Sequence, residues 1–354
     1  MGTESTTNYS YLGRSISHLT INEESSSSAF SDCNSDRSGE FSAASSQTRR
    51  LLLACATDNS DELIRQLVSD LGSDSVNEQK QAAMEIRLLA KNKPENRIRI
   101  AEAGAIKPLI SLISSQDLQL QEYGVTAILN LSLCDENKDA IASAGAIRSL
   151  VRVLSSGNST AKENAACALL RLSQVDAYKP AIGRAGAIPP LVKLLETGSV
   201  RGKKDASTAL YSLCSTKDNK VRAVKAGIMR VLVELMADLE GDMVDKSAYV
   251  ASVVVTVAEG RAAFVAEGGI PVLVEIVEVG TQRQKEIAVV ILLQICEESA
   301  AYRKLVFDES AIPPLVALSQ SGTNRAKEKA EKLIELLRQP RSNNGTARAS
   351  EVSL

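Results

Sequence analysis

Tryptophan is absent from this sequence of 354 residues, and the only histidine is His18. His18 lies in a Ser-rich stretch that we expect to stay outside the folded part. The folded part therefore has no histidine, which excludes from it a Ser-His-Asp or Cys-His catalytic arrangement and a histidine-bound zinc ion. A site built on Lys, Tyr or a carboxylate is left open by this count, although no such group of residues stands out. We therefore predict a protein that is not an enzyme and that has no cofactor, no metal site and no small-molecule substrate.

Long apolar runs and closely paired cysteines are lacking as well. No stretch is long enough to cross a bilayer, no signal-peptide pattern is present, and the six cysteines form no C-x-x-C pair. The formal net charge of -2 gives no general attraction to nucleic acid or to anionic lipid. We expect a cytoplasmic protein, with the nucleus as a second location, that has reduced cysteines and no nucleic-acid partner. The opening MGTEST fits the loose N-myristoylation pattern at Gly2, where a single acyl chain would anchor the protein only weakly and without membrane insertion.

What the sequence does contain is a repeated phrase. AGAIPPLVKLL, which begins at Ala185, recurs in altered form along the chain. Its glycine returns every 41 residues, at Gly104, Gly145, Gly186, Gly227 and Gly268, and Ser310 takes its place 42 residues further on. A fixed period of this length predicts a helical solenoid, in which each repeat packs only on its neighbours.

Each repeat has three segments. A short amphipathic segment leads into the glycine, where the backbone can turn sharply. The second segment is a helix with apolar residues two, five, six, eight and nine positions after the glycine, beginning with Ile188 and Leu191 in one copy, which together make a wide apolar face. The third segment, such as residues 162–173, is a longer helix with small residues on one side. Seven repeats result, of which the first is degenerate and lacks the glycine.

Composition and period divide the chain into three regions. Residues 1–48 are Ser-rich and are predicted to be disordered, residues 49–338 form the repeat domain, and residues 339–354 form a flexible polar tail. Two interpretations of the Ser-rich region stay open. It is either a passive terminus or a regulatory tail in which phosphorylation adds charge, since Arg14-Ser15 and Arg37-Ser38 each place a cation beside a hydroxyl.

The repeated sequence resembles the armadillo repeat. The phrases ALLRLS-x-x-D-x-x-K-x-x-I-x-x-AGAIPPLVKLL from Ala168 and AILNLS-x-x-D-E-N-K-x-x-I-x-x-AGAIRSLVRVL from Ala127 are most similar to the armadillo domains of plant U-box ubiquitin ligases. The resemblance covers residues 49–338 and implies an all-α fold, an armadillo α-solenoid that winds as a right-handed superhelix of about seven three-helix units. Nothing before residue 50 resembles a U-box, so the resemblance implies substrate recognition without a self-contained ligase activity.

The resemblance also implies where a partner binds. In the armadillo family the third helices line a concave groove, and proteins of the nuclear-import class use a Trp and an Asn four residues apart in it. Only Asn130 keeps that Asn and no position keeps the Trp, which disfavours recognition of nuclear-localisation signals. The predicted groove residues are Tyr123, Thr126, Asn130, Asn164, Arg171, Asp205, Ser212, Lys246, Tyr249 and Gln294.

Among these residues Tyr123, Arg171 and Tyr249 are of the types that most often anchor interfaces, although each on its own also fits an ordinary solvated helix face. The sequence therefore predicts a protein–protein interaction scaffold that holds a partner protein in its groove and takes part in ubiquitin-linked signalling. Three alternatives stay open, namely a direct role in ubiquitin transfer, a membrane-tethered scaffold and a nuclear-transport scaffold.

Overall fold

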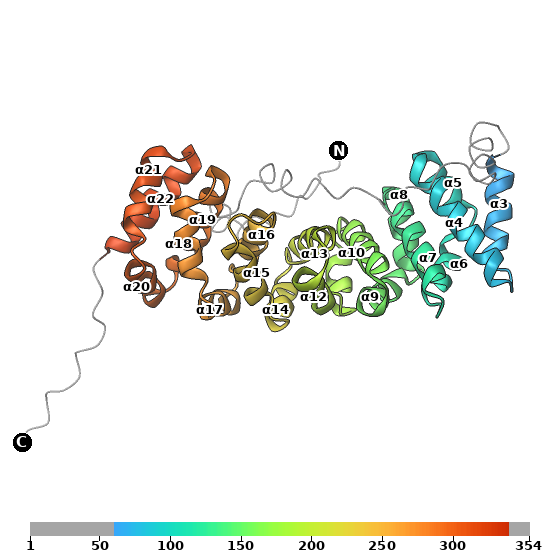
Figure 1. The fold of residues 1–354 in the computed structure, drawn as a ribbon, viewed down its shortest axis with the longest axis horizontal. Helices are drawn as coiled ribbons and strands as arrows, with labels where there is room; N and C mark the ends of the chain where they lie inside the picture. Colours follow the sequence, from blue (N-terminus) through green and yellow to red (C-terminus); the bar gives the residue numbers. More distant parts are fainter. Residues whose placement is uncertain (1–59, 340–354) are drawn as a thin grey trace, which may run out of the picture. The chain divides into compact units, whose positions relative to one another are not determined.

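The computed structural model describes residues 60–339, in which every regular element is an α-helix (Figure 1). This confirms the predicted all-α class. The predicted Ser-rich tail, residues 49–59 of the predicted repeat domain and the C-terminal segment from residue 340 lie outside the described residues. The described chain divides into two compact units, residues 60–267 and residues 268–339.

The unit of residues 60–267 contains five repeats in succession and the first helix of a sixth. Its helices are α3 (Ser60–Asp70), α4 (Val76–Asn92), α5 (Pro94–Glu102), α6 (Ile106–Ile113), α7 (Leu118–Leu131), α8 (Asp135–Ser143), α9 (Ala146–Ser156), α10 (Ser159–Ser173), α11 (Tyr178–Arg184), α12 (Ile188–Thr197), α13 (Val200–Leu213), α14 (Lys217–Lys225), α15 (Ile228–Ala237), α16 (Val244–Val254) and α17 (Ala258–Ala266). From α5 onward they follow the predicted order of first, second and third helix, whereas the degenerate first repeat shows only α3 and α4.

The unit of residues 268–339 completes the sixth repeat and contains the seventh. Its helices are α18 (Gly269–Val279), α19 (Gln282–Glu297), α20 (Ala300–Asp308), α21 (Ile312–Ser321) and α22 (Asn324–Arg338). The third helices α19 and α22 pack on one another, and α18 packs on α21. The same neighbour-on-neighbour stacking therefore operates in both units.

The turn between first and second helices is where the repeat glycine is needed. Gly104, Gly145, Gly186, Gly227 and Gly268 all have φ between +75° and +91°, and Ser310 adopts φ +59° at the equivalent place. An added Cβ at any of the five glycines would meet no atom within 4 Å. The glycine is therefore required by its left-handed backbone and not by crowding, because this conformation is unfavourable for residues that carry a Cβ.

The apolar positions of the pattern form the core. Ile188, Leu191 and Leu195 on α12 are fully buried, and so are the small residues Ala165 and Ala166 on α10, which let neighbouring helices approach closely. All four cysteines in residues 60–339 are free thiols, three of them buried in third helices or at their ends. Burial raises the pKa of Cys214 and of Cys296 to about 12. These thiols stay protonated at neutral pH and are not nucleophiles.

Asparagines in the first helices join successive repeats. The amide nitrogen of Asn137 donates to the carbonyl oxygens of Leu131, 3.1 Å away at the end of the preceding third helix, and of Arg97, 3.0 Å away in the previous first helix. Asn219, two periods later, makes the same pair of bonds to Leu213 and Lys179 at 3.0 Å each. Each of these asparagines therefore ties its first helix both to the end of the preceding third helix and to the previous first helix.

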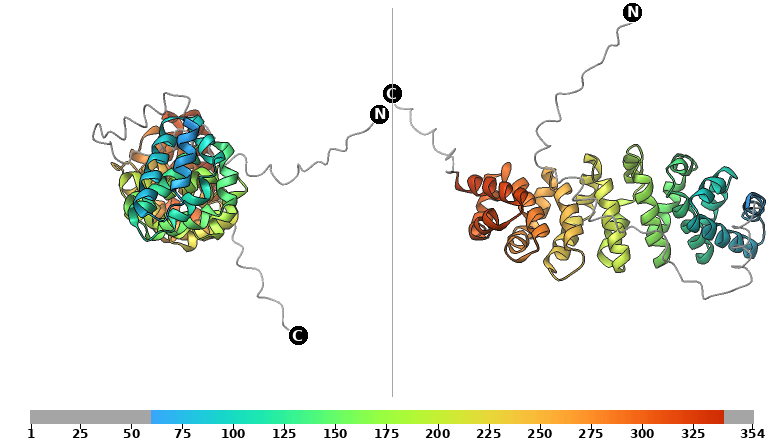
Figure 2. Two further views of the ribbon diagram at one scale, coloured as in Figure 1. Left: turned by 90° about the vertical axis from the view of Figure 1, so that its right-hand side faces the viewer. Right: turned by 90° about the horizontal axis from the view of Figure 1, so that it is seen from above.

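Third helices stack in chain order within residues 60–267. Helix α4 packs on α7, α7 on α10, α10 on α13 and α13 on α16. The right-hand view of Figure 2 shows this progression from α3 to α17, with no return of the chain. Side chains at equivalent positions of these five helices consequently lie next to one another, and the candidate site is built on this surface.

We predict that replacing glycine by serine at a left-handed turn lowers the stability of the protein, whereas replacing serine by glycine does not. Gly186→Ser places a Cβ at φ +88° and should destabilise the protein by about 1 kcal/mol, whereas Ser310→Gly relieves the same strain and should be neutral or stabilising by up to about 1 kcal/mol. Thermal and urea denaturation followed by circular dichroism measures both. Ser111→Gly, at an exposed position within α6, is the control and should destabilise. A destabilising Ser310→Gly would contradict this account of the turn.

Candidate functional site

The residues that cap three of the third helices also contact the third helix of the previous repeat. Asp117, Asn158 and Ser199 accept hydrogen bonds from backbone N–H groups at the starts of α7, α10 and α13, and so cap these helices. Asp117 also pairs with Lys80 of α4 at 2.5 Å, and the amide of Asn158 donates to Glu122 of α7 at 2.9 Å. The hydroxyl of Ser199 donates to Glu163 of α10 at 2.5 Å. Each cap therefore also links two repeats.

The electrostatics of these caps follow from the same contacts. The Lys80 ammonium, together with the backbone N–H of Leu120, holds the pKa of the Asp117 carboxyl below its ordinary value. Thr323 repeats the arrangement in the other unit, where it caps α22 and donates to Glu286 of α19 at 2.7 Å. The link therefore occurs in both units, at four of the third helices.

A buried polar network lies one turn further along the third helices. The amide of Asn164 on α10 donates to the hydroxyl of Thr126 on α7 at 2.8 Å, and the Arg201 guanidinium on α13 donates to the Asn164 carbonyl oxygen at 2.8 Å. Arg201 also lies 3.5 Å from Asp205 and 3.9 Å from Glu163. Three successive repeats are thus joined through one amide side chain that is 0% exposed.

Asn130 is the residue that keeps the family's asparagine. Its amide nitrogen donates to the carbonyl oxygen of Arg87 on α4 at 3.0 Å, and the side chain is 0% exposed. The Arg87 guanidinium in turn lies 5.0 Å from the centroid of the Tyr123 ring on α7, within the range of a cation–π contact. Asn130 therefore holds α7 against α4, while Tyr123 is left half-buried at the surface.

Further along the stack, Tyr211 on α13 and Tyr249 on α16 meet edge to face with ring centroids 6.5 Å apart. Tyr249 is 2% exposed and Tyr211 is half-buried. The hydroxyl of Ser212 lies 2.7 Å from that of Ser173, which joins α13 to α10. An aromatic pair of this geometry stabilises the contact between two repeats beyond the area that it buries.

The ten predicted groove residues therefore differ in what they present to solvent. Nine of them lie on the stacked third helices of residues 60–267, and Gln294 lies on α19 of the other unit. Tyr123, Arg171 and Ser212 are half-buried, whereas the following are buried: Thr126, Asn130, Asn164, Asp205, Lys246, Tyr249 and Gln294. We call the half-buried residues of α7, α10 and α13 at this surface the third-helix face; they are Tyr123, Arg171, Tyr211 and Ser212. Partner binding there stays a prediction.

Three residues that the sequence analysis did not predict at this surface are important for its structure. Arg87 and Arg201 organise the polar contacts between repeats, and Tyr211 adds a half-buried aromatic ring to the third-helix face. Arg201 is the second residue after its cap, Ser199, so the repeat period already implies that it lies near the preceding third helix. The sequence gives no comparable indication that Arg87 lies over Tyr123, because that contact depends on the offset between the adjacent helices α4 and α7.

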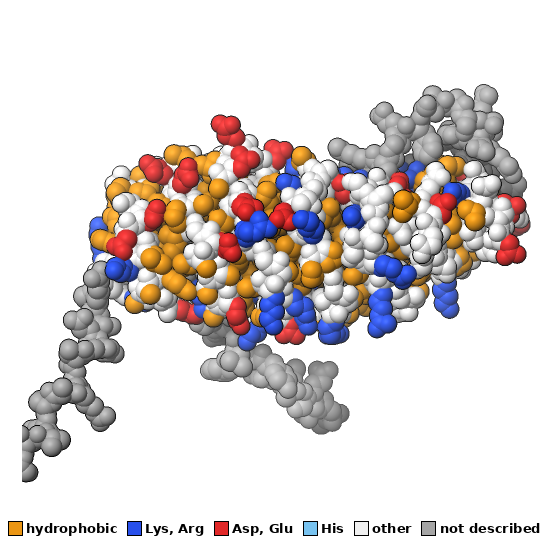
Figure 3. All heavy atoms as spheres, turned by 60° about the horizontal axis from the view of Figure 1, so that its bottom comes forward, with side chains coloured by type: hydrophobic (Ala, Val, Ile, Leu, Met, Phe, Trp, Pro, Cys, Tyr) orange, Lys and Arg blue, Asp and Glu red, His pale blue; other side chains and the backbone are white. Residues whose placement is uncertain are grey.

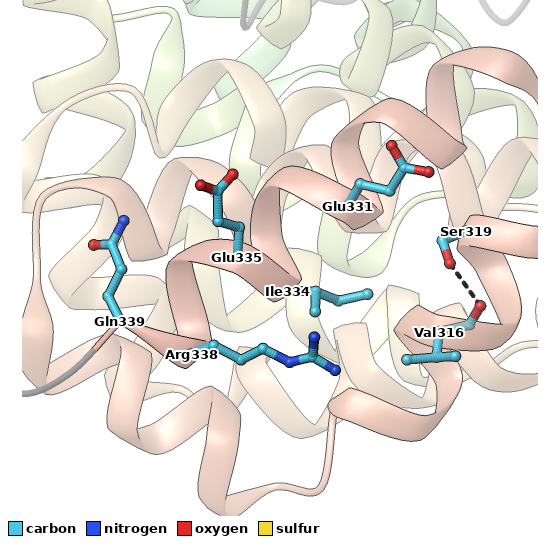
Figure 4. A pocket seen from close by; sticks show the side chains of 7 residues that line it. All are labelled: Val316, Ser319, Glu331, Ile334, Glu335, Arg338 and Gln339. Carbon is cyan, nitrogen blue, oxygen red and sulfur yellow. Dashed lines mark hydrogen bonds between the residues drawn. The ribbon is translucent and has the colours of Figure 1, made fainter.

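A shallow depression of about 560 Å³ lies in the last repeat, and none of the predicted groove residues lines it (Figure 4). Val316 of α21 and Ile334 of α22 form its apolar side, and Ser319 of α21 also lines it, with its hydroxyl donating to the Val316 carbonyl oxygen at 2.8 Å. The remaining lining residues are Glu331, Glu335, Arg338 and Gln339.

Residues 60–339 contain no group of His, Cys, Asp and Glu arranged to hold a metal ion. Within the same range, no helix has both the length and the apolar character needed to span a bilayer.

Comparison with known proteins agrees with this geometry. The family model described as the plant U-box protein ARM repeat region matches residues 61–353. U-box domain-containing protein 4 of Arabidopsis thaliana is 66% identical over 261 residues, which make up 74% of this chain and 31% of that protein. E3 ubiquitin-protein ligase SPL11 of Oryza sativa subsp. japonica is 57% identical over 70 residues, 20% of this chain and 10% of that protein. The chain thus spans about a third of the length of one relative and matches a tenth of the other.

Solved structures show the same architecture. The crystal structure of an engineered protein superposes on this chain with a TM-score of 0.69 at 27% sequence identity, over 77% of this chain and 68% of that one. With the family match, this similarity confirms the predicted armadillo-type solenoid. The match is to the repeat region of the relatives and does not extend to a U-box.

We predict that Asn164→Ala destabilises the protein by about 1–3 kcal/mol, because the buried Thr126 and the half-buried Arg201 lose their hydrogen bonds together. Urea denaturation measures the change. Asn77→Ala, at an exposed position of α4, is the matched control and should stay within about 0.5 kcal/mol of the parent. A double-mutant cycle with Arg201→Ala should show coupling, and strictly additive effects would contradict the network.

Proposed function

Because this chain belongs to the family of plant U-box armadillo-repeat regions, we propose that it is a binding scaffold that holds a partner protein on its third-helix face. The armadillo solenoid is in general a protein-binding fold, since stacked repeats present an extended surface built from many neighbouring helices. The function proposed for this chain in particular is recognition of one partner segment by the third-helix face of α7, α10 and α13.

The observation that carries the proposal is the way side chains are held on that face. Tyr123 is fixed by the cation–π contact with Arg87, and Tyr211 by the edge-to-face contact with Tyr249. Both rings remain half-buried, so that each offers part of its surface while its other side is packed. Rigid aromatic side chains lose little conformational entropy on binding, which is why they recur at the energetic centres of interfaces.

Charge on this surface is mixed. Glu122 and Glu163 lie on α7 and α10, whereas Arg201 and Lys204 lie on α13, where Lys204 is 3.6 Å from Asp242. A uniformly acidic or uniformly basic partner would meet as many repulsive as attractive charges along this surface. The mixed pattern favours a partner segment with both polar and aromatic residues and with little net charge.

The proposed cellular role is substrate recruitment in ubiquitin-linked signalling. It is supported by the family match and by the relatives, one of which is named as an E3 ubiquitin-protein ligase. The proposal places the protein in the cytoplasm and the nucleus. The four free cysteines among residues 60–339 support a reducing compartment.

We predict that the double variant Tyr123→Ala, Arg171→Ala loses partner capture from plant extract by about tenfold or more, since two anchoring side chains typically account for more than about 1 kcal/mol each. Quantitative mass spectrometry after affinity capture measures the loss. Tyr249 is unsuitable for this test because it is buried, and its truncation would open a cavity.

The matched control is Lys217→Ala, Lys304→Ala, which removes exposed cations from α14 and α20, outside the third helices and outside the second helices. Its captured proteins should equal those of the parent. Unchanged capture by the Tyr123 and Arg171 variant, with an unchanged melting temperature, would place the partner on another surface.

A direct role in ubiquitin transfer is the second candidate, favoured by the named ligase among the relatives. We predict that the purified chain, mixed with ubiquitin, an activating enzyme, a conjugating enzyme and ATP, forms no ubiquitin chains in excess of the reaction without it. Immunoblotting for ubiquitin measures the products, and a U-box ligase is the positive control. Chain formation that depends on this protein alone would establish the second candidate in place of the first.

A further inference from the structure

Exposed cations gather on the second helices of the repeats. Lys107 on α6 and Arg148 and Arg152 on α9 are all exposed, and neither helix contains an acidic residue. None of the three forms an ion pair within residues 60–339. Figure 3 shows Lys and Arg side chains projecting in a row along the lower edge of the face that it draws. These charges are therefore available to a partner.

The cations lie on a common face because they occupy equivalent positions on neighbouring helices. Lys107 and Arg148 are each the third residue after the glycine of their repeat, and Arg152 follows one helical turn later. Helix α6 packs on α9, and α9 on α12. Lys193 on α12 takes the same position as Arg152, and Arg230 on α15 takes the same position as Lys107. We call this set, Lys107, Arg148, Arg152, Lys193 and Arg230, the basic ridge.

One end of the basic ridge already binds a carboxylate. Glu196 of α12 contacts Arg230 of α15 and lies 2.9 Å from Lys193, while Arg230 also reaches Glu234 at 2.8 Å. The Arg230 and Lys193 contacts lower the pKa of Glu196 to about 2. With these two carboxylates included, the ridge keeps a formal charge of +3, and the excess is concentrated at Lys107, Arg148 and Arg152.

A complementary segment exists in the same chain. Residues 22–40 contain five acidic side chains and one cation, Arg37, which gives a formal charge of -4, together with seven serines. The side chains of the other terminal segment, residues 340–354, carry a net positive charge and would be repelled by the ridge, because they include Arg341, Arg348 and a single acidic residue, Glu351. Charge complementarity therefore selects residues 22–40 as the occupant of the ridge.

The chain is long enough to bring them together. Residues 41–59 separate the acidic segment from the start of α3, and an extended chain of this length spans up to about 65 Å. Packed helices lie about 8–10 Å apart, so the four repeat steps from α3 to α15 amount to roughly 40 Å. Attachment in one chain gives an effective concentration of the order of millimolar, at which even weak ion pairing is populated.

We propose that residues 22–40 bind the basic ridge on the second helices of their own chain. This contact lies on different helices from the third-helix face and leaves that face open, so the proposal does not depend on the proposed function and can fail separately from it. Its consequence is that the acidic segment and any external anionic partner compete for the same five cations.

Zero-length carbodiimide cross-linking of the full chain tests the proposal, since it joins a carboxylate to a lysine only when the two are in contact. In the monomer band, peptide mass spectrometry should find Glu23, Glu24, Asp32, Asp36 or Glu40 joined to Lys107 or Lys193. In about 0.5 M NaCl these products should decline, because exposed charges are screened. Products from residues 22–40 that are spread evenly over all exposed lysines, including Lys304 of α20, would overturn the proposal.

The matched variants separate contact from folding. Arg148→Glu, Arg152→Glu changes two exposed side chains and should lower the yield of these cross-links by about fivefold with an unchanged circular-dichroism melting curve. Lys304→Glu, Lys327→Glu should leave the yield unchanged. Sedimentation with vesicles of phosphatidylcholine and phosphatidylserine, mixed at about 7:3, tests the competing occupant. Ridge-dependent vesicle binding without internal cross-links would assign the ridge to a lipid surface and overturn the proposal.

Discussion

Each repeat of this protein buries its apolar residues partly within itself and partly against the repeats next to it. Helices α6, α9, α12 and α15 have an apolar face more than about a hundred degrees wide, and no single three-helix unit has enough internal volume to cover it. The fully buried Ile188, Leu191 and Leu195 depend on neighbours as much as on their own repeat. Stability and the geometry of every surface therefore both depend on how accurately one repeat is placed on the next.

Polar contacts supply much of that accuracy. The helix caps Asp117, Asn158 and Ser199 reach the previous third helix, and Asn137 and Asn219 reach the previous first helix. Apolar packing tolerates sliding, since dispersion contacts have little directional preference, whereas a buried hydrogen bond is lost by a shift of less than an ångström. Directional hydrogen bonds and ion pairs that recur between repeats thus fix how each repeat is placed on the next. The third-helix face has a defined shape only if this placement is fixed.

The two polar surfaces of residues 60–267 differ in how their charges are used. On the third helices, cations and carboxylates are mutually paired, as with Arg201, Asp205 and Glu163, and the third-helix face adds two half-buried tyrosine rings and a hydroxyl. On the second helices, Lys107, Arg148 and Arg152 have no counter-ions within the described chain. The first surface suits recognition by shape and hydrogen bonding, and the second suits attraction of an anionic segment over a longer range. One array can therefore carry two contacts without competition between them.

The sequence by itself determined the repeat, its period and its secondary structure. The glycine spacing predicted five sharp turns, which the structure shows as left-handed backbone and repeats at Ser310, and the apolar offsets predicted the buried face of each second helix. These features are local, because a backbone conformation or a helical face depends on residues within a few turns. Only the tertiary structure decided which groove residues are accessible. It buried Asn130, Asn164 and Tyr249 between repeats and left Tyr123, Arg171 and Tyr211 at the surface, since exposure depends on the offset and angle at which neighbouring third helices pack.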